Sequence, residues 1–180
     1  MVAKAILVLP KRDFRGQTFL VLSGTLEESD VAVFVSSSTL EACVAEDGFV
    51  VKPDFRNIDV KGTEWDAIIF LDGLGSSEYW FDSTAHTLCQ VAWSADRLVG
   101  AIGPAVLTVV NSGIAAGLRV ASGKSLVDAV SAKDGIPSRR PVEVDGNLVT
   151  AIDDSAAEAF AAKVAELLTG QKRSKIAGAA

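Results

Sequence analysis

Four short, uninterrupted apolar runs constrain the fold of this chain more than any other feature. They occupy residues 5–9, 31–35, 67–71 and 98–102. A continuous apolar run is typical of a strand buried on both faces of a parallel sheet, because a half-exposed strand alternates with polar residues. Segments with helical spacing or helix-start signals lie between and after these runs. The alternation predicts a single-domain, three-layer α/β sandwich with a mostly parallel sheet.

Shorter elements are predicted in the remaining segments. Helices are expected over residues 18–26, from about 82 to 95, 104–113 and 124–132, and a short strand at 118–121. Residues 10–16 form a polar loop, and the alternating region 41–61 predicts a hairpin or short edge strands. Residues 142–145 and 148–151 flank Gly146-Asn147, which predicts a second hairpin.

The last helix has a predicted start and end. Ser155 is the expected N-cap, with Glu158 three residues later completing a capping box. Gly170 is expected to end the helix. The chain therefore divides into one domain, residues 1–170, and a flexible tail, residues 171–180, where a small basic cluster lies.

Composition excludes several classes of function. The net charge of −6 argues against a nucleic-acid partner, which usually requires a basic surface. Apolar runs of four to seven residues are too short to span a membrane, and the first residues lack the pattern of a signal peptide. Two cysteines without metal-ligand spacing and a single histidine predict no metal, and no cofactor is expected. A cytoplasmic location follows as the expectation.

The junction between the fourth run and the next helix resembles the place where an α/β enzyme holds its nucleophile. Leu98–Ile102 is the strand, Gly103 is the turn, and Pro104 starts a helix that ends near Gly113. Gly103 has no side chain, so it offers no nucleophile. We call Ile102–Pro104 the elbow.

Several motifs, in their order and spacing, resemble one known superfamily. They are Lys4–Leu9, Asp13–Arg15, Trp65–Phe70, Gly73–Tyr79, Phe81–Leu88, Ala101-Ile102, Asn111–Gly113 and Val142–Thr150. Over residues 3–169 the chain resembles the ThiJ/PfpI superfamily, which includes intracellular protease- and amidase-like proteins and a deglycase. The resemblance implies a flavodoxin-like, class I glutamine amidotransferase-like fold.

The resemblance also assigns functional positions. The superfamily's cysteine nucleophile corresponds to Gly103, its frequent neighbouring histidine to Pro104, and its supporting glutamate to Thr18. Glu78 matches an accessory acidic residue. A two-residue deletion would instead align Gly103-Pro104 with a Gly-Pro that follows the cysteine, but the spacing to Gly113 favours the ungapped register. Either alignment leaves the elbow without a cysteine.

The expected ligand site lies where loops meet at the carboxyl ends of the strands: residues 10–17, 72–78, 103–104 and those after 121. Its predicted residues are Thr18, Gly75, Glu78, Gly103 and Pro104, with no catalytic residue.

Three functions remain open. The first is a non-catalytic protein that binds a small-molecule ligand. The second is a hydrolase, glyoxalase or deglycase that works without a thiol, through Asp13, Glu78 or a bound water. The third is an oligomeric scaffold whose pocket is filled by side chains.

Other chemistry-bearing residues have structural interpretations. Cys43 and Cys89 are expected to be separate thiols, and Cys89 to pack inside a helix. His86 is expected on a helix surface, without a nucleophile beside it. The aromatic triplet Tyr79-Trp80-Phe81 cannot face inward as a whole, and we expect it to help form a homodimer or a higher homo-oligomer.

Overall fold

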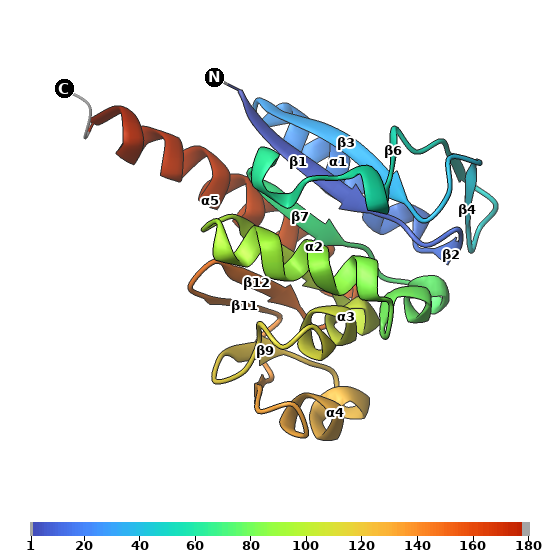
Figure 1. The fold of residues 1–180 in the computed structure, drawn as a ribbon, viewed down its shortest axis with the longest axis vertical. Helices are drawn as coiled ribbons and strands as arrows, with labels where there is room; N and C mark the ends of the chain where they lie inside the picture. Colours follow the sequence, from blue (N-terminus) through green and yellow to red (C-terminus); the bar gives the residue numbers. More distant parts are fainter. Residues whose placement is uncertain (1, 178–180) are drawn as a thin grey trace.

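A computed structural model describes residues 2–177. Its centre is a seven-stranded sheet with the order β11-β12-β8-β7-β1-β3-β6 (Figure 1). All neighbouring strands in this sheet are parallel except β11, which pairs antiparallel with β12. Its strands are β1 (Ala3–Val8), β3 (Val31–Ser37), β6 (Phe55–Arg56), β7 (Ala67–Phe70), β8 (Leu98–Ile102), β11 (Val142–Asp145) and β12 (Leu148–Ala151).

Within residues 2–177, five α-helices and several 3₁₀ helices surround the sheet. The α-helices are α1 (Gly16–Glu28), α2 (Ser83–Ser94), α3 (Val106–Asn111), α4 (Val127–Ser131) and α5 (Ala157–Ala177). The 3₁₀ helices are η1 (Asn57–Asp59), η2 (Gly62–Glu64), η3 (Leu74–Tyr79), η4 (Gly103–Ala105), η5 (Lys124–Leu126) and η6 (Asp154–Ala156). Two small sheets complete the fold: β2 (Arg12–Phe14) with β4 (Cys43–Ala45) and β5 (Val50–Val51), and β9 (Arg119–Ala121) with β10 (Ile136–Ser138).

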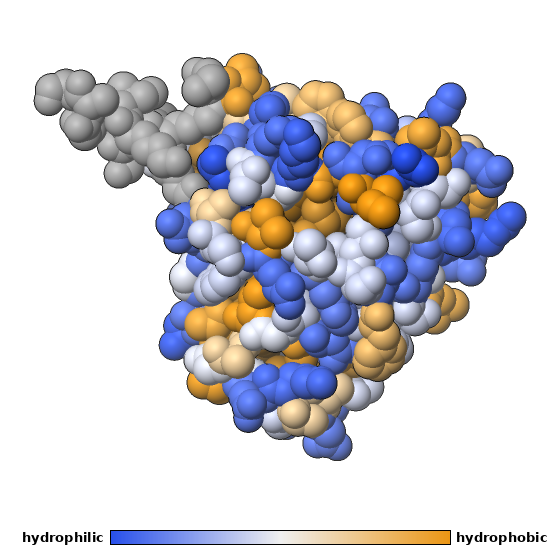
Figure 2. All heavy atoms as spheres, in the orientation of Figure 1, coloured by the Kyte–Doolittle hydropathy of each residue, from blue (hydrophilic) through white to orange (hydrophobic). Residues whose placement is uncertain are grey.

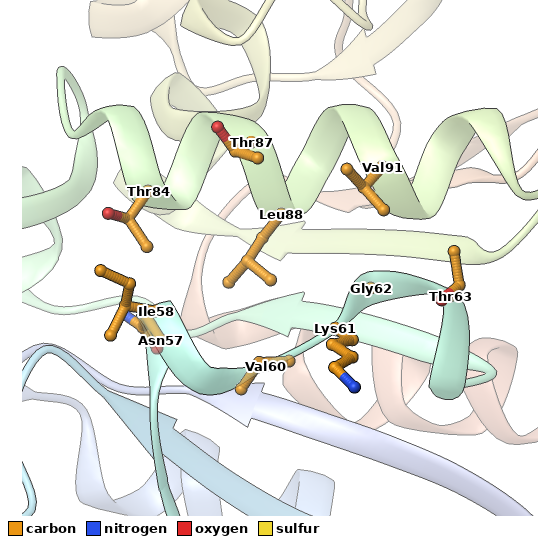
Figure 3. Close-up of a pocket in the computed structure, with 10 residues that line it drawn as sticks. All are labelled: Asn57, Ile58, Val60, Lys61, Gly62, Thr63, Thr84, Thr87, Leu88 and Val91. Carbon is orange, nitrogen blue, oxygen red and sulfur yellow. The ribbon is translucent and has the colours of Figure 1, made fainter.

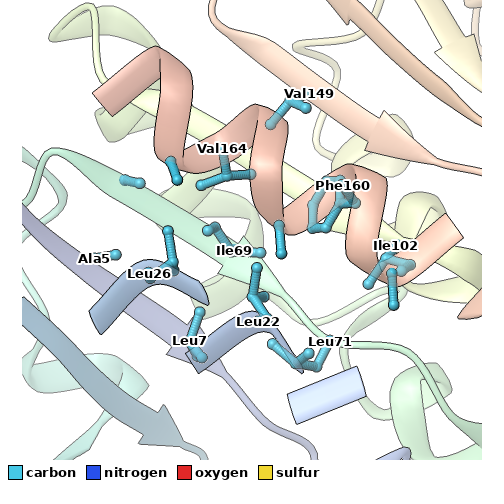
Figure 4. Close-up of a cluster of buried hydrophobic side chains, with 14 of the residues drawn as sticks. Ala5, Leu7, Leu22, Leu26, Ile69, Leu71, Ile102, Val149, Phe160 and Val164 are labelled. Carbon is cyan, nitrogen blue, oxygen red and sulfur yellow. The ribbon is translucent and has the colours of Figure 1, made fainter. Parts of the chain in front are cut away.

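Two hydrophobic cores, one on each face of the sheet, give the three predicted layers. On one face α1 and α5 bury Leu22, Leu26, Phe160 and Val164 against residues of the strands such as Leu7 (Figure 4). On the other face α2 and α3 bury a second cluster against the strands. Because both faces are covered, β7 and β8 are buried at every position and β1 at every position except Lys4, which is why their sequences show no polar alternation.

Most predicted strands are confirmed. The strand at Leu98–Ile102 and the hairpin strands at Val142–Asp145 and Leu148–Ala151 have the predicted bounds. Gly146 at the hairpin turn has a φ of 60°, as the turn requires. The region 41–61 forms the β4–β5 hairpin and the edge strand β6, as expected. Residues 10–16, predicted to be a loop, contain the short strand β2, which pairs with the distant β4.

The final helix differs from the prediction at both ends. Asp153, not Ser155, provides the N-terminal cap, because its carboxylate accepts a hydrogen bond from the backbone N–H of Ser155 at 3.0 Å. The helix then continues through Gly170 to Ala177. A glycine weakens a helix interior by only about 1 kcal/mol, so it does not by itself end one. Residues 178–180 of the predicted tail lie outside the described residues.

Among residues 2–177, none of the helices combines the length and the hydrophobicity that crossing a bilayer requires.

Candidate functional site

The elbow forms at the carboxyl end of β8, at the centre of the sheet. Gly103 has a φ of 59°, in the left-handed region that side chains rarely adopt. A Cβ added to Gly103 would lie 3.1 Å from the Cβ of Asp72 and 3.8 Å from the Cα of Asp153. The backbone turn and the close approach of Asp72 both favour glycine at this position.

Sheet register brings Asp72 to the elbow. Phe70 of β7 pairs with Ala101 of β8, so Asp72 and Gly103, each two residues further on, leave the sheet side by side. Sequence reasoning placed Asp72 in a site loop but did not single it out. The available signal was its position, since a charged residue directly after a buried strand falls at the edge where parallel sheets hold their sites.

Asp72 is a buried carboxyl with one unsatisfied oxygen. The residue is 2% exposed. Its Oδ2 accepts a hydrogen bond from Thr18 Oγ1 at 3.4 Å and lies 3.9 Å from Nε of Arg15. Its Oδ1 is buried and has no hydrogen-bond partner. An unpartnered buried acceptor is unfavourable in a folded protein, and such groups are concentrated at functional sites.

Burial raises the pKa of Asp72 to about 7. The Thr18 hydrogen bond and the Arg15 guanidinium oppose this shift, while the negative charge of Asp154 adds to it. Burial dominates because the carboxylate form loses its hydration when it is enclosed. The elbow therefore carries a group that changes charge near neutral pH.

A small cavity of about 170 Å³ lies at the start of α1, and we call it the α1–α5 cavity. Its lining includes Arg15 and Thr18, the two residues that contact the Asp72 carboxyl. The complete lining is Arg15, Gln17, Thr18, Val21, Asp154, Ser155, Ala157 and Glu158. Arg15 Nη1 forms an ion pair with Asp154 Oδ2 at 3.0 Å. The cavity therefore lies between the start of α1 and the start of α5.

The five predicted site residues make contacts in two groups. Thr18 and Gly103 both contact Asp72. The carbonyl of Pro104 accepts a hydrogen bond from Nε1 of Trp80 at 2.9 Å, which ties the elbow to the residue after η3.

Glu78 and Gly75 contact the loop after β1 instead. Glu78 accepts hydrogen bonds from the Lys11 backbone N–H at 2.8 Å and from the Ser38 hydroxyl. A Cβ on Gly75 would collide with the backbone carbonyl of Arg12, so glycine allows η3 to pack against β2. These contacts give Glu78 and Gly75 roles in positioning η3.

Neither thiol lies at the elbow. Cys43 and Cys89 are both buried and free. Burial raises the pKa of Cys43, with Ser37 opposing the shift and Glu78 adding to it. Burial raises the pKa of Cys89 to about 12, although Ser112 opposes the shift. A reactive cysteine needs a lowered pKa and access to solvent, and these two cysteines have neither.

The aromatic triplet Tyr79-Trp80-Phe81 is divided between core and surface, and His86 contacts its backbone. Tyr79 is buried, and its hydroxyl donates to the Leu9 carbonyl at 2.7 Å. Phe81 is 80% exposed, so one member of the triplet faces outward, as predicted. Nε2 of His86 lies 2.9 Å from the Trp80 carbonyl oxygen, and the half-buried ring has no nucleophile as a hydrogen-bond partner.

A larger cavity, about 490 Å³, lies between α2 and the η1–η2 segment (Figure 3). Leu88 and Val91 line it from α2, and Val60 lines it from the opposite side. Figure 2 shows apolar side chains gathered on this face of the molecule. No motif indicated this cavity, because the β6–β7 connection was not predicted to consist of the 3₁₀ turns η1 and η2.

Within the described part of the chain, no cluster of three or more His, Cys, Asp or Glu side chains is arranged to hold a metal ion.

Known proteins resemble this chain along nearly all of its length. An uncharacterized protein of Methanocaldococcus jannaschii is 27% identical over 165 residues, which cover 90% of this chain and 80% of that protein. Protein dj-1beta of Drosophila melanogaster is 25% identical over 174 residues, covering 96% and 93% of the two chains. The crystal structure of a ThiJ/PfpI domain protein from Brachyspira murdochii has the same fold. It superimposes with a TM-score of 0.90 at 22% identity, covering 93% of this chain and 96% of that one.

A sequence model of one family spans the central sheet, the elbow and most of α5. The DJ-1/PfpI family model matches residues 4–167. The fold comparison agrees with this match, since the Drosophila DJ-1beta structure superimposes with a TM-score of 0.84 over 99% of this chain. The chain belongs to the DJ-1/PfpI family.

Proposed function

We propose that this protein is a ligand-binding member of the DJ-1/PfpI family that lacks cysteine-dependent catalysis. The observation that carries the proposal is the elbow itself. Gly103 occupies the position that the family resemblance assigns to the nucleophile, and the Asp72 carboxyl lies where a side chain on residue 103 would project. The ligand would bind near Thr18, Asp72 and Gly103.

The two thiols support this proposal. Covalent catalysis by cysteine requires a thiolate beside the reacting group. Cys43 and Cys89 are buried away from the elbow, and burial raises the pKa of each. A thiol with a raised pKa is almost fully protonated at neutral pH, so neither group would act as the nucleophile.

Turnover measurements test the proposal. Purified protein would be assayed with methylglyoxal and with small peptide amides, before and after thiol alkylation. We expect no turnover above the buffer rate in either state, and the same result for the Cys43→Ala/Cys89→Ala variant. Turnover that alkylation or the double variant abolishes would refute the proposal, because it would place a working thiol in this chain.

A second candidate function, non-thiol hydrolysis, is favoured by one observation. Asp72 has a pKa of about 7 and an unpartnered oxygen, which are the properties of a general base that activates water near neutral pH. Asp13 and Glu78 suit this role less well. Asp13 is exposed, and Glu78 is already paired with Lys11 and Ser38.

The assay for this second function uses the same peptide amides. General-base catalysis contributes roughly 10²–10⁴-fold. Turnover that survives alkylation and disappears in Asp72→Asn would establish hydrolysis. Turnover that persists in Asp72→Asn would exclude Asp72 as the base.

The scaffold hypothesis receives less support. Thr18, one of the predicted site residues, lines the open α1–α5 cavity of about 170 Å³. A cavity with polar walls at a predicted site residue favours binding over a purely structural role.

A further inference from the structure

We propose that Arg15 exchanges carboxylate partners when Asp72 ionises, so that its guanidinium leaves Asp154 and closes on the buried Asp72 carboxylate. The exchange transmits the charge of the elbow to the start of α5, and it makes Arg15 the moving part of a pH-sensitive switch. The inference goes beyond the proposed function, because it holds whatever the site binds. It follows from the geometry of these three side chains and from the difference in their burial.

Arg15 is placed between the two carboxyl groups. Its backbone N–H donates to the Asp72 carbonyl oxygen at 3.1 Å, which fixes the Arg15 backbone beside the elbow. Its side chain reaches outward, where Nη1 lies 3.0 Å from Oδ2 of Asp154. Its Nε lies 3.9 Å from Oδ2 of Asp72, which is too far for a hydrogen bond. Arg15 therefore has one close carboxyl partner and one distant one.

The two carboxyl groups differ in burial. The Asp154 side chain is 47% exposed, whereas the Asp72 side chain is 2% exposed. An exposed ion pair contributes little to stability, because water solvates both charges and salt screens them. A buried charge without a close partner is strongly unfavourable. Once Asp72 is charged, the Arg15 guanidinium therefore stabilises the protein more at Asp72 than at Asp154.

The contacts of Asp72 in the structure suit the protonated form. Its Oδ1 has no hydrogen-bond partner, and its Oδ2 accepts only the long bond from Thr18 Oγ1 at 3.4 Å. A charge-assisted N–H···O bond is about 2.7–2.9 Å long, so Nε of Arg15 needs to move by only about 1 Å to form one. Because the guanidinium is a rigid plane, this movement also draws Nη1 away from Asp154.

The other charged residues around Asp72 do not replace Arg15. Among the ion pairs of residues 2–177, Arg15 supplies the basic partner of Asp72. Gly103 adds no charge from the elbow. The remaining charged residues near this end of the surrounding elements are Arg12 and Asp13 on β2, Glu46 and Asp47 in the β4–β5 turn, Glu78 on η3, and Asp153, Asp154 and Glu158 at the start of α5. Because most of these groups are acidic, a charged Asp72 depends on the Arg15 guanidinium.

The exchange should take place near neutral pH. Burial raises the pKa of Asp72 to about 7, and the negative charge of Asp154 adds to this shift. Below that pH Asp72 is protonated and Arg15 stays on Asp154; above it Arg15 closes on Asp72. Arg15 and Asp154 both line the α1–α5 cavity, so the exchange also changes the wall of this cavity.

An NMR titration of isotopically labelled protein between pH 5 and pH 9 tests the switch. It follows three signals: the side-chain carboxyl carbons of Asp72 and Asp154, and the Nε–H of Arg15. We expect all three signals to shift with one common midpoint, and the Arg15 Nε proton to move downfield as its hydrogen bond forms. An Asp72 carboxyl that titrates without a response at Arg15 and Asp154 would overturn the proposal. So would an Asp72 carboxyl that does not titrate over this range.

Two variants identify the partners. Asp72→Asn keeps the shape of the side chain without its charge, and it should remove the response of Arg15 and Asp154 near neutral pH. Asp154→Asn frees the guanidinium and removes a negative charge, so it should lower the midpoint of Asp72 by at least half a pH unit. Circular dichroism would confirm that each variant is folded.

Two further variants are the controls. Glu158→Gln also removes a carboxylate from the wall of the α1–α5 cavity, but within the described residues Glu158 forms no ion pair with Arg15. It should shift the Asp72 midpoint less than Asp154→Asn does. Asp128→Asn, on α4, should leave the midpoint unchanged. Equal shifts in Glu158→Gln and Asp154→Asn would overturn the proposal, because they would show a general effect of charge without an exchange of partners.

Discussion

Two residues, Gly103 and Asp72, define the chemistry of the elbow at the residue scale. Gly103 has no side chain where the family resemblance places a nucleophile. A Cβ added there would lie 3.1 Å from the Cβ of Asp72 and 3.7 Å from its carboxyl Oδ2. The two positions are coupled, because any side chain on residue 103 would have to share its space with Asp72. Replacing either residue should therefore change the packing around the other.

Replacing Gly103 with alanine should destabilise the protein by roughly 1–3 kcal/mol. The new Cβ would be strained at a φ of 59° and would press on Asp72. Gly24→Ala is the matched control, because Gly24 lies inside α1 with nothing within 4 Å of an added Cβ. The free energy of unfolding of Gly24→Ala should rise by about 0.5–1 kcal/mol. Urea unfolding of both variants measures the difference, and equal effects would contradict the account of the elbow.

Asp72→Asn should stabilise the protein at high pH. The pKa of Asp72 in the folded protein, about 7, lies above the ordinary aspartate pKa of 3.8, so the folded state prefers the protonated form. The stability contributed by this group is therefore complete below pH 4 and is lost as the pH rises through 7. Asparagine avoids that loss. We expect the variant to be more stable by roughly 1–4 kcal/mol at pH 8 and nearly unchanged at pH 4.

Chemical denaturation at both pH values measures this effect. A variant that is less stable than the parent protein at pH 8 would show that the Asp72 carboxylate is well solvated or fully paired.

At the scale of elements, sequence periodicity predicted the strands whose residue pattern is set by burial. The central strands lie between two hydrophobic cores, so their apolar runs mark them directly. The hairpin at residues 142–151 was identified because Gly146-Asn147 is a turn signal. The strand β2 was missed because three residues are too few to show an alternating pattern. Its pairing partner β4 also lies about thirty residues away in the sequence.

The N-terminus of α5 was missed for a related reason. Asp153 and Ser155 are both good caps by residue type, and only the backbone decides which one is used. Asp153 is extended and accepts from the Ser155 backbone N–H, so the cap of the 3₁₀ helix η6 lies two residues before the predicted cap, Ser155.

Asp153→Ala should therefore destabilise the protein more than Ser155→Ala does. Loss of the cap should reduce the free energy of unfolding by about 1 kcal/mol. Ser155→Ala keeps the backbone N–H and should change stability by less than about 0.5 kcal/mol. Thermal unfolding of the two variants ranks them. A larger loss of stability in Ser155→Ala than in Asp153→Ala would identify Ser155 as the cap.

At the scale of the whole molecule, the fold and its family were predictable, whereas the candidate site was predictable only in part. Motif order identified the family, and the elbow followed from one strand-turn-helix junction. The contacts of Asp72 could not be predicted, because they depend on the register between β7 and β8 and on the docking of α1 and α5. The packing of η3 against the loop after β1 likewise decides that Glu78 pairs with Lys11 and Ser38.

The surface adds a prediction about assembly. Leu74, the first residue of η3, and Phe81, which follows Trp80, are 81% and 80% exposed. Large exposed apolar side chains favour contacts with another protein surface, and we propose that these two help form a homodimer. The Leu74→Ser/Phe81→Ser variant should dissociate at concentrations where the parent protein is dimeric, as measured by sedimentation velocity. A parent protein that stays monomeric at all concentrations would exclude the dimer.

The most direct test of the central claim, that the elbow holds a buried carboxyl in place of a thiol, is an NMR titration of the Asp72 side-chain carboxyl carbon. The signal would be assigned by its absence in Asp72→Asn. The account predicts a midpoint near pH 7, because burial outweighs the Thr18 and Arg15 contacts. A midpoint near pH 4 would mean that Asp72 is solvated or fully paired, and would contradict the structure proposed for the elbow.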